Sequence, residues 1–455
     1  MRDRISEALK SAEGYTEIRV QQKQSTSLAF RRGETDKIAA STDVGGCVRA
    51  LVPGGGWGFA TFNTLDNLAD RVEEAVASSK AIEPEEPIEL VEAEPVDMVI
   101  RAVIEDDPRE RTIAEKMELI EKYDGLLRSR DDRIIDTSVS YGDSFSTVWF
   151  ANTDGSFFER ERLDVVLRAV AMGKDGDNVQ TSHDSWSSRK GFAMVKDRED
   201  DIRNVAEIAV GLLDSEQVKA GKYTVVLDPM LAGVFIHEAF GHLSESDHIV
   251  DNPQAREMMT LGRRFGPDEL NVIDDGTVIP HLRGTVEIDD EGVPCRKNYL
   301  IKEGVLVGRL HNRETAAKMK EGLTGNARAE DYSYPPIIRM TNTAIENGTV
   351  SFDDMIADIK EGVYCIDAFG GQTMMENFSF SAGHAFMIRD GKIAEMVRDV
   401  VLQGNLFQTL MNIEAIGSDF RWSYSGGQCG KGGQGAAVSF GSPHIRIKDV
   451  IIGGK

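Results

Sequence analysis

The chain has few of the residues that cross-link proteins or ligate metals: four cysteines and eight histidines among 455 residues. Four cysteines in a chain of this length cannot form a disulfide framework, so we expect a reducing compartment. No apolar run approaches the roughly 18 residues that span a bilayer. Residues 1–7 also lack the apolar core of a secretory signal. The sequence therefore predicts a cytoplasmic protein that makes no membrane contact.

Basic side chains are also scarce. The 52 Lys and Arg residues are outnumbered by 76 Asp and Glu, which gives a formal net charge of −24. A net-negative surface repels phosphates, which argues against nucleic acid as the main partner. The length predicts about two to four domains, and a hydrophobic content of 41% supports sizeable packed cores. Because histidine and cysteine are rare, any clustering of them is informative.

Residues 1–220 combine strand-like runs with amphipathic helices. The strand-like runs lie within 16–62 and 133–192. Asp107 and Pro108 are expected to cap and open the second of three helices that follow a short N-terminal one. We expect one N-terminal mixed α/β domain at 1–220 in a protein of the α+β class, because the regular alternation of a doubly wound sheet is missing. The three helices are predicted from apolar stripes at helical spacing: Leu65-Leu68-Val72-Val76, Ile113-Met117-Ile120-Tyr123-Leu127 and Ile202-Val205-Ala209-Leu212.

Residues 221–455 are expected to form a β-rich C-terminal domain that carries one key helix. An apolar strand at 223–227 is followed by Asp228 and Pro229, the pattern of a helix cap and first turn. This helix should run to about residue 240. From residue 270 onward, short strand-like runs and glycine turns predominate.

The key helix contains the sequence H-E-A-F-G-H at 237–242, an H-E-x-x-x-H pattern. The related H-E-x-x-H pattern places both histidines on one helix face with the glutamate beside them. Here the gap of five residues rotates a regular helix by about 500°, which leaves the two rings roughly 140° apart. His237 and His242 can share a metal only if the helix widens or breaks near His242. Gly241 stands where that break is needed, because glycine adopts unusual dihedrals cheaply.

A catalytic zinc site also needs a third protein ligand and an open position for water. The candidates are the other histidines, Glu245, Asp247 and the cysteines. Cys429 stands out because it lies in a glycine-dense loop at 423–435, which can approach a metal closely. From the residues alone, all of these candidates stay open.

Further motifs extend along the chain and together carry a resemblance. They are G-W-G-F-A at 56–60, H-E-A-F-G-H at 237–242, L-G-R-R-F-G at 261–266, D-D-E-G-V-P at 289–294, R-E-T-A-A at 313–317, G-N-A-R-A at 325–329 and C-G-K at 429–431. With these motifs, nearly the whole chain resembles the TldD branch of the TldD/PmbA metallopeptidase family. The partner branch, called PmbA or TldE, is similar in fold but lacks H-E-x-x-x-H. This chain retains it and so resembles the catalytic branch.

The resemblance implies a function and a set of site residues. His237, His242 and Cys429 would bind zinc (Zn2+), and Glu238 would be catalytic; none of these four positions departs from the family pattern. The family acts on peptides, and it implies a homodimer, or a heterodimer with a PmbA/TldE-like protein, that encloses the site. We therefore predict a zinc-dependent peptidase that hydrolyses unfolded or modified peptides through a metal-activated water.

Two other functions remain open. Cys429 paired with a histidine would make a thiol hydrolase, and such an enzyme should survive chelation. A noncatalytic peptide-binding or assembly subunit is the second alternative, but it would need none of the four site residues.

Other polar residues near these motifs have secondary candidate roles. One group is expected to be satisfied polar groups between strands rather than substrate contacts: His311, Asn326 and Arg328. Another group follows the second histidine, and for it we expect a solvated helix end in preference to support for the imidazole: Glu245, Asp247 and His248. The acidic run at 289–291 is expected to be a turn, because it lacks the alternating ligands of a calcium loop.

Overall fold

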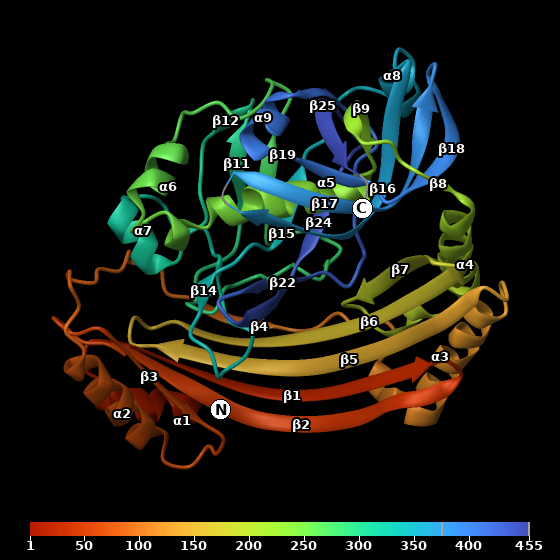
Figure 1. The fold of residues 1–455 in the computed structure, drawn as a ribbon. Helices are drawn as coiled ribbons and strands as arrows, with labels where there is room; N and C mark the ends of the chain where they lie inside the picture. Colours follow the sequence, from red (N-terminus) through yellow and green to blue (C-terminus); the bar gives the residue numbers. More distant parts are fainter. Residues whose placement is uncertain (375, 454–455) are drawn as a thin grey trace.

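The computed structural model describes residues 1–374 and 376–453 and shows a mixed α+β fold (Figure 1). The α+β class expected from the sequence is therefore confirmed. Long antiparallel strands run along one side of the molecule, and the segments that follow residue 220 lie over one face of these strands. The domain boundary expected at residue 220 stays a prediction.

A seven-stranded sheet dominates the N-terminal half. Its strands follow the order β3-β2-β1-β5-β6-β4, and β7 also pairs with β6. Four of its strands are 17 to 19 residues long, which is well beyond the usual strand length of about five or six. The strands are β1 (Tyr15–Arg31), β2 (Glu34–Leu51), β3 (Trp57–Phe62), β4 (Asp97–Ile100), β5 (Ile134–Asn152), β6 (Phe157–Asp175) and β7 (Asn178–Ser188).

Helices lie at both ends of this sheet (Figure 1). At one end are α1 (Arg2–Ala8) and α2 (Leu68–Ala81); at the other are α3 (Ile113–Arg128) and α4 (Glu199–Asp214). Each pair of helices buries its own hydrophobic cluster against the strands. The three helices predicted from apolar stripes are therefore confirmed.

The predicted start of α3 is wrong. Asp107 accepts a hydrogen bond from the Arg109 backbone and caps a short 3-10 turn, Pro108–Glu110. The α-helix begins only at Ile113. Thr112 caps it in a reciprocal capping box with Glu115, which satisfies two of the backbone N–H groups that a helix start leaves without partners.

Two further sheets build the C-terminal half. An eight-stranded sheet has the order β16-β9-β25-β19-β17-β18-β8 with β20 on β25, and β16 also pairs with β17, so the sheet closes on itself. A six-stranded sheet has the order β12-β11-β10-β15-β24-β21. The strands of the larger sheet are β8 (Glu216–Gln217), β9 (Gly221–Leu227), β16 (Glu361–Met374), β17 (Asn377–Arg389), β18 (Lys392–Arg398), β19 (Val401–Asn405), β20 (Ile413–Ile416) and β25 (Ile445–Gly453). Those of the smaller sheet are β10 (Val272–Asp275), β11 (Lys297–Lys302), β12 (Val305–Leu306), β15 (Asn342–Ile345), β21 (Arg421–Trp422) and β24 (Ser439–Ser442).

Short hairpins and helices complete this half. Two small hairpins pair β13 (Ala327–Arg328) with β14 (Ile337–Ile338), and β22 (Gln428–Lys431) with β23 (Gln434–Ala437). Among its helices, α5 (Pro229–Ile236) packs against β16 of one sheet and against β15 and β24 of the other. Because α5 lies between two sheets, it is apolar on nearly all sides. The remaining helices are α6 (Pro253–Met258), α7 (Arg313–Met319), α8 (Phe352–Ile356) and α9 (Leu406–Met411).

The acidic run at 289–291 joins the two halves. Asp289 accepts hydrogen bonds from the backbone N–H groups of Glu291 and Val293, so the expected turn is confirmed. Glu291 binds the buried Arg49 of β2 at 2.8 Å. Through this ion pair, the turn anchors the C-terminal half on the N-terminal sheet.

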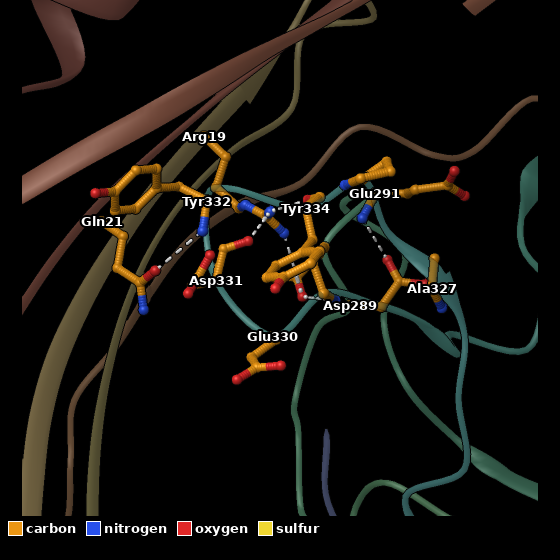
Figure 2. A network of polar contacts seen from close by, with 12 residues as sticks. Arg19, Gln21, Asp289, Glu291, Ala327, Glu330, Asp331, Tyr332 and Tyr334 are labelled. Carbon is orange, nitrogen blue, oxygen red and sulfur yellow. Dashed lines mark hydrogen bonds and ion pairs between the residues drawn. The ribbon is translucent and has the colours of Figure 1, made fainter. Parts of the chain in front are cut away.

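A loop at 329–335 makes a second contact between the halves (Figure 2). Arg19 of β1 donates hydrogen bonds to the carbonyl oxygens of Asp331 and Tyr334, at 2.7 and 2.9 Å. The Tyr332 backbone N–H donates to the side chain of Gln21, two residues further along β1. The loop is therefore held on the face of the long strands.

Within the described residues 1–374 and 376–453, no helix has the length and apolar character needed to cross a membrane.

Candidate metal centre

The helix that carries the first histidine begins as the sequence predicts. The Asp228 side chain accepts hydrogen bonds from the backbone N–H groups of Met230 and Leu231, and Pro229 occupies the first turn. The regular helix ends at Ile236. The chain then continues as a π-helical turn over His237–Gly241.

The π-helical turn brings the two histidines together. The His242 backbone N–H donates to the carbonyl of His237, which is the i→i+5 bond of a π-helix. The two rings lie with their centroids 5.4 Å apart. The deformation that the spacing of five requires is thus present, and a regular helix would have pointed the rings apart.

Gly241 serves this turn differently from the sequence expectation. Its φ of −57° and ψ of −52° are ordinary helical values, so the unusual dihedrals expected there are wrong. A Cβ atom on Gly241 would instead lie 2.0 Å from Sδ of the buried Met340. The glycine is needed because another part of the chain approaches the helix closely.

Gly241→Ala is expected to destabilise the protein by about 1–3 kcal/mol, because the new methyl group overpacks the core at Met340. Gly125→Ala is the matched control: Gly125 lies in α3, and nothing lies within 4 Å of its added Cβ. That control should stabilise by about 0.5–1 kcal/mol. Urea unfolding measures both variants, and equal stabilities would contradict the packing role of Gly241.

Cys429 reaches the histidines from the β22–β23 hairpin. Its Sγ lies 3.2 Å from Nε2 of His242, across 187 residues of sequence. Ligand atoms of His237, His242 and Cys429 all lie within 4.8 Å of one another. His237 is 1% exposed and Cys429 5%. The structure therefore brings together the three residues that the sequence proposed as ligands.

The chemistry of this cluster suits a metal ion. Two imidazoles and one thiolate are a donor set that zinc accepts, and three protein ligands leave a position for substrate or water. Nδ1 of His237 is buried and has no hydrogen-bond partner in the part of the chain that the structure describes. An unsatisfied buried polar atom is costly, so its presence beside two other donors favours a bound ion.

The surroundings of the cluster favour a thiolate at Cys429 and a protonated ring at His242. Burial of Cys429 opposes ionisation, but the neighbouring imidazoles of His237 and His242 lower the pKa of the thiol to about 5. For His242 burial likewise opposes the charged form, yet hydrogen bonds with Cys429 and Glu245 raise its pKa to about 10. Cysteine binds metals as the thiolate and histidine as the neutral imidazole, so metal binding would displace the proton of His242.

A buried carboxylate supports the second histidine. Glu245 is fully buried, and its Oε2 lies 3.0 Å from Nδ1 of His242. Lys431, two residues beyond Cys429, binds the same Oε2 at 3.0 Å and Asp247 at 2.7 Å. A carboxylate on the far nitrogen of a ligand histidine fixes its ring and tautomer. The solvated helix end expected here is therefore wrong for Glu245, although His248 has a side chain that is 57% exposed.

A buried arginine that sequence reasoning missed holds the hairpin. Arg339 is 1% exposed and donates hydrogen bonds to the carbonyl oxygens of Cys429 and Gln434, one on each strand of the hairpin. No carboxylate pairs with Arg339 among residues 1–374 and 376–453. Its position suggests that it sets the backbone from which Cys429 projects. Arg339 follows the two-residue strand β14. No sequence pattern identifies it as a donor to backbone carbonyls of the distant hairpin.

Glu238 lies beside the cluster without joining it. Its Oε2 is 3.8 Å from Nε2 of His242, and its side chain is 32% exposed. The secondary candidates behave as expected: His311, Asn326 and Arg328 are buried and hydrogen-bonded to neighbouring protein groups. His311 is not among the clustered donors.

Comparison with known proteins places this chain in a family. Three family models match the chain: the PmbA/TldA metallopeptidase C-terminal domain at residues 220–454, domain 1 at 16–79 and the central domain at 106–213. The chain belongs to the PmbA/TldD metallopeptidase family. The resemblance seen in the sequence motifs is therefore confirmed.

Members of the PmbA/TldD family from distant organisms are similar over most of the chain. A metalloprotease of Synechocystis is 45% identical and covers 98% of this chain and 96% of its own length. A metalloprotease TldD homolog of Buchnera aphidicola is 31% identical over 75% of this chain and 72% of its own. The crystal structure of TldE from Thermococcus kodakarensis has a TM-score of 0.79 and 19% identity, and it covers all of both chains. At that identity the TldE structure shows a common fold only.

Proposed function

We propose that this chain is a zinc-dependent peptidase of the TldD branch that hydrolyses unfolded or modified peptides. The observation that carries the proposal is the cluster of His237, His242 and Cys429, with ligand atoms within 4.8 Å of one another. The metalloprotease names of the relatives agree with it. In this proposal the three residues are the zinc ligands and Glu238 is the catalytic residue.

The chain's own residues supply the proton transfers and the geometry. Glu238 is close enough to the cluster to accept a proton from the attacking water and to pass it to the leaving amine. Glu245 and Lys431 hold the His242 ring while this happens. Zinc, when bound, would lower the pKa of a water molecule and polarise the scissile carbonyl.

The proposal also includes the substrate, the partner and the cellular location. We expect extended peptides as substrates, and a dimer, either of two copies or with a TldE-like protein. The common fold with TldE supports such a pairing, because similar subunits can form a pseudo-symmetric interface. All four cysteines are free, which agrees with the reducing environment of a cytoplasm.

The test is metal analysis combined with chelation. We expect about one zinc per chain, loss of peptide hydrolysis after chelation, and recovery when zinc is returned. Plasma emission spectrometry and turnover of an unstructured peptide, with and without a TldE-like partner, measure these outcomes. Hydrolysis that persists in protein stripped of metal would overturn the proposal, and peptide binding without turnover would favour a noncatalytic subunit.

One observation favours a second function. His242 contacts Cys429 at 3.2 Å through Nε2 and Glu245 at 3.0 Å through Nδ1, which are the contacts of a nucleophile, a base and an orienting acid. A thiol hydrolase would use these three residues without His237. It would also survive chelation, so the same experiment separates the two functions.

A further inference from the structure

A polar cavity lies between the N-terminal sheet and the hairpin that carries Cys429. Its volume is about 200 Å³. Three long strands contribute alternate residues to its wall: 19, 21 and 23 of β1; 144, 146 and 148 of β5; and 160, 162 and 164 of β6. Alternate residues share one face of a strand. In the figure, β22 lies over this region of the sheet (Figure 1).

The hairpin separates the cavity from the metal centre. Gln428 lines the cavity, and so does Ala436, the cross-strand partner of Cys429. Because Cys429 itself contacts His242, the two sites share the β22–β23 hairpin as a common wall. The loop at 329–335, shown in Figure 2, closes another side.

Arginines line this cavity in excess of the carboxylates that pair with them. Asp290 is shared by Arg19 and Arg160, at 3.5 and 3.1 Å. Asp164 is likewise shared by Arg162, at 2.5 Å, and Arg283, at 4.0 Å. Each of these carboxylates thus serves two guanidinium groups, in a protein whose overall charge is −24.

A fifth arginine at the cavity forms no ion pair with a carboxylate in the described part of the chain. Arg328 is 7% exposed and donates only to the carbonyl oxygens of Met340 and Ala437 among the described residues. Burial and the neighbouring arginines lower its pKa to about 10. The other charges at the cavity are those of Lys23, Glu330 and Asp331. Glu330 and Asp331 accept backbone hydrogen bonds from Gly435 and Ser333.

The cavity wall also contains a buried hydrogen-bond donor without a partner among the described residues. Nε of Arg283 is buried without a hydrogen-bond partner in the described part of the chain. Buried cations and donors without partners are costly, and the cost falls when an anion binds. Arginine is also the residue that matches the planar shape of a carboxylate.

From this excess of buried and partly buried guanidinium groups beside the Cys429 hairpin, we infer that the cavity binds a carboxylate group of the peptide substrate. The inference rests on the proposed function, because a carboxylate is the anion that an unmodified peptide supplies. The group is either the C-terminal carboxylate or an Asp or Glu side chain. A peptide anchored in the cavity lies against the β22–β23 hairpin, which also borders the metal centre.

Equilibrium binding to the full-length Glu238→Gln protein tests the inference without requiring hydrolysis. Fluorescence anisotropy compares labelled neutral hexapeptides with a free C-terminus or a C-terminal amide. A second pair of amidated peptides has an internal Glu or Gln. We expect about tenfold tighter binding of one carboxylate peptide over its neutral partner, and the pair that discriminates identifies the source of the carboxylate.

Arginine variants in the same background locate the binding site. Arg283→Gln and Arg162→Gln should each remove most of the tenfold preference, and Arg162→Gln keeps the test decisive if the other variant does not fold. Arg203→Gln, which removes an exposed charge on α4, should leave the preference unchanged. Equal binding of both members of both pairs overturns the inference, and so does a preference that survives both cavity variants. Zinc-dependent hydrolysis without any carboxylate preference would leave the proposed function standing and remove the inference alone.

Discussion

Glu238→Gln is expected to retain zinc and to lose peptide hydrolysis by about 10²–10⁴-fold, the usual contribution of a general acid–base residue. Glutamine has nearly the same shape but cannot accept the proton of the attacking water. Glu238 is not among the clustered donors, and its nearest oxygen lies 3.8 Å from Nε2 of His242. The substitution should therefore leave the three proposed ligands in place. Steady-state kcat on an unstructured peptide and zinc content per chain are the two measurements.

The control for Glu238→Gln is Glu257→Gln. Glu257 is exposed on α6, in the segment that follows the cluster, so this substitution makes the same chemical change away from the site. It should leave both kcat and zinc content unchanged. Full activity of Glu238→Gln would remove Glu238 from the mechanism, and loss of zinc from that variant would mean that the carboxylate helps to hold the metal.

The sequence predicts the site most successfully where local chemistry decides the structure. Asp228 and Pro229 start α5 as their cap-and-first-turn pattern indicates. A metal shared by His237 and His242 requires a deformed helix because of the gap of five, and a π-helical turn is found there. Each of these features depends on residues within one or two helical turns, so a single sequence is enough to predict them.

The contacts that assemble the site are determined by tertiary packing and could not be predicted in the same way. Glu245 looks like the end of a solvated helix, yet Lys431 reaches it from a hairpin far along the chain. Arg339 holds Cys429 through backbone carbonyls, which carry no sequence signal. The sequence predicts unusual backbone dihedrals at Gly241, but the glycine is instead needed because Met340 packs closely against it. In each case the partner comes from a distant segment, and only the fold shows which segment it is.

The full length of the strands could not be predicted for a related reason. The half of β2 that spans residues 34–44 is almost entirely exposed, so it lacks the alternation of apolar and polar residues by which strands are recognised. Pairing with β1 along the whole hairpin keeps it extended. The same hairpin carries the face that bears Arg19, Gln21 and the cavity wall. Hydrogen bonding across the sheet thus builds a polar surface that a search for apolar periodicity does not find.

His237→Gln is expected to weaken zinc binding by more than about 100-fold, the upper range for loss of a residue that only supports a ligand. It should also abolish hydrolysis. His237 is 1% exposed, and the other donors of the cluster lie around it. Without its imidazole only His242 and Cys429 remain, and two protein ligands are fewer than the three of a catalytic zinc site. Zinc content after dialysis and turnover of an unstructured peptide are measured together, with thermal unfolding to verify the fold.

His237→Gln also distinguishes the two candidate functions, because a thiol hydrolase would use Cys429, His242 and Glu245 but not His237. A thiol hydrolase would therefore retain much of its activity in this variant while any bound zinc is lost. His248→Gln is the matched control, since His248 follows the same helix with a side chain that is 57% exposed, and its only contact with the site among the described residues is a 4.0 Å approach to Oε2 of Glu245, too exposed to contribute much. That control should keep both zinc and activity. If His237→Gln stays active with no zinc bound, Cys429 is the nucleophile; if zinc stays at one per chain, His237 is not a ligand.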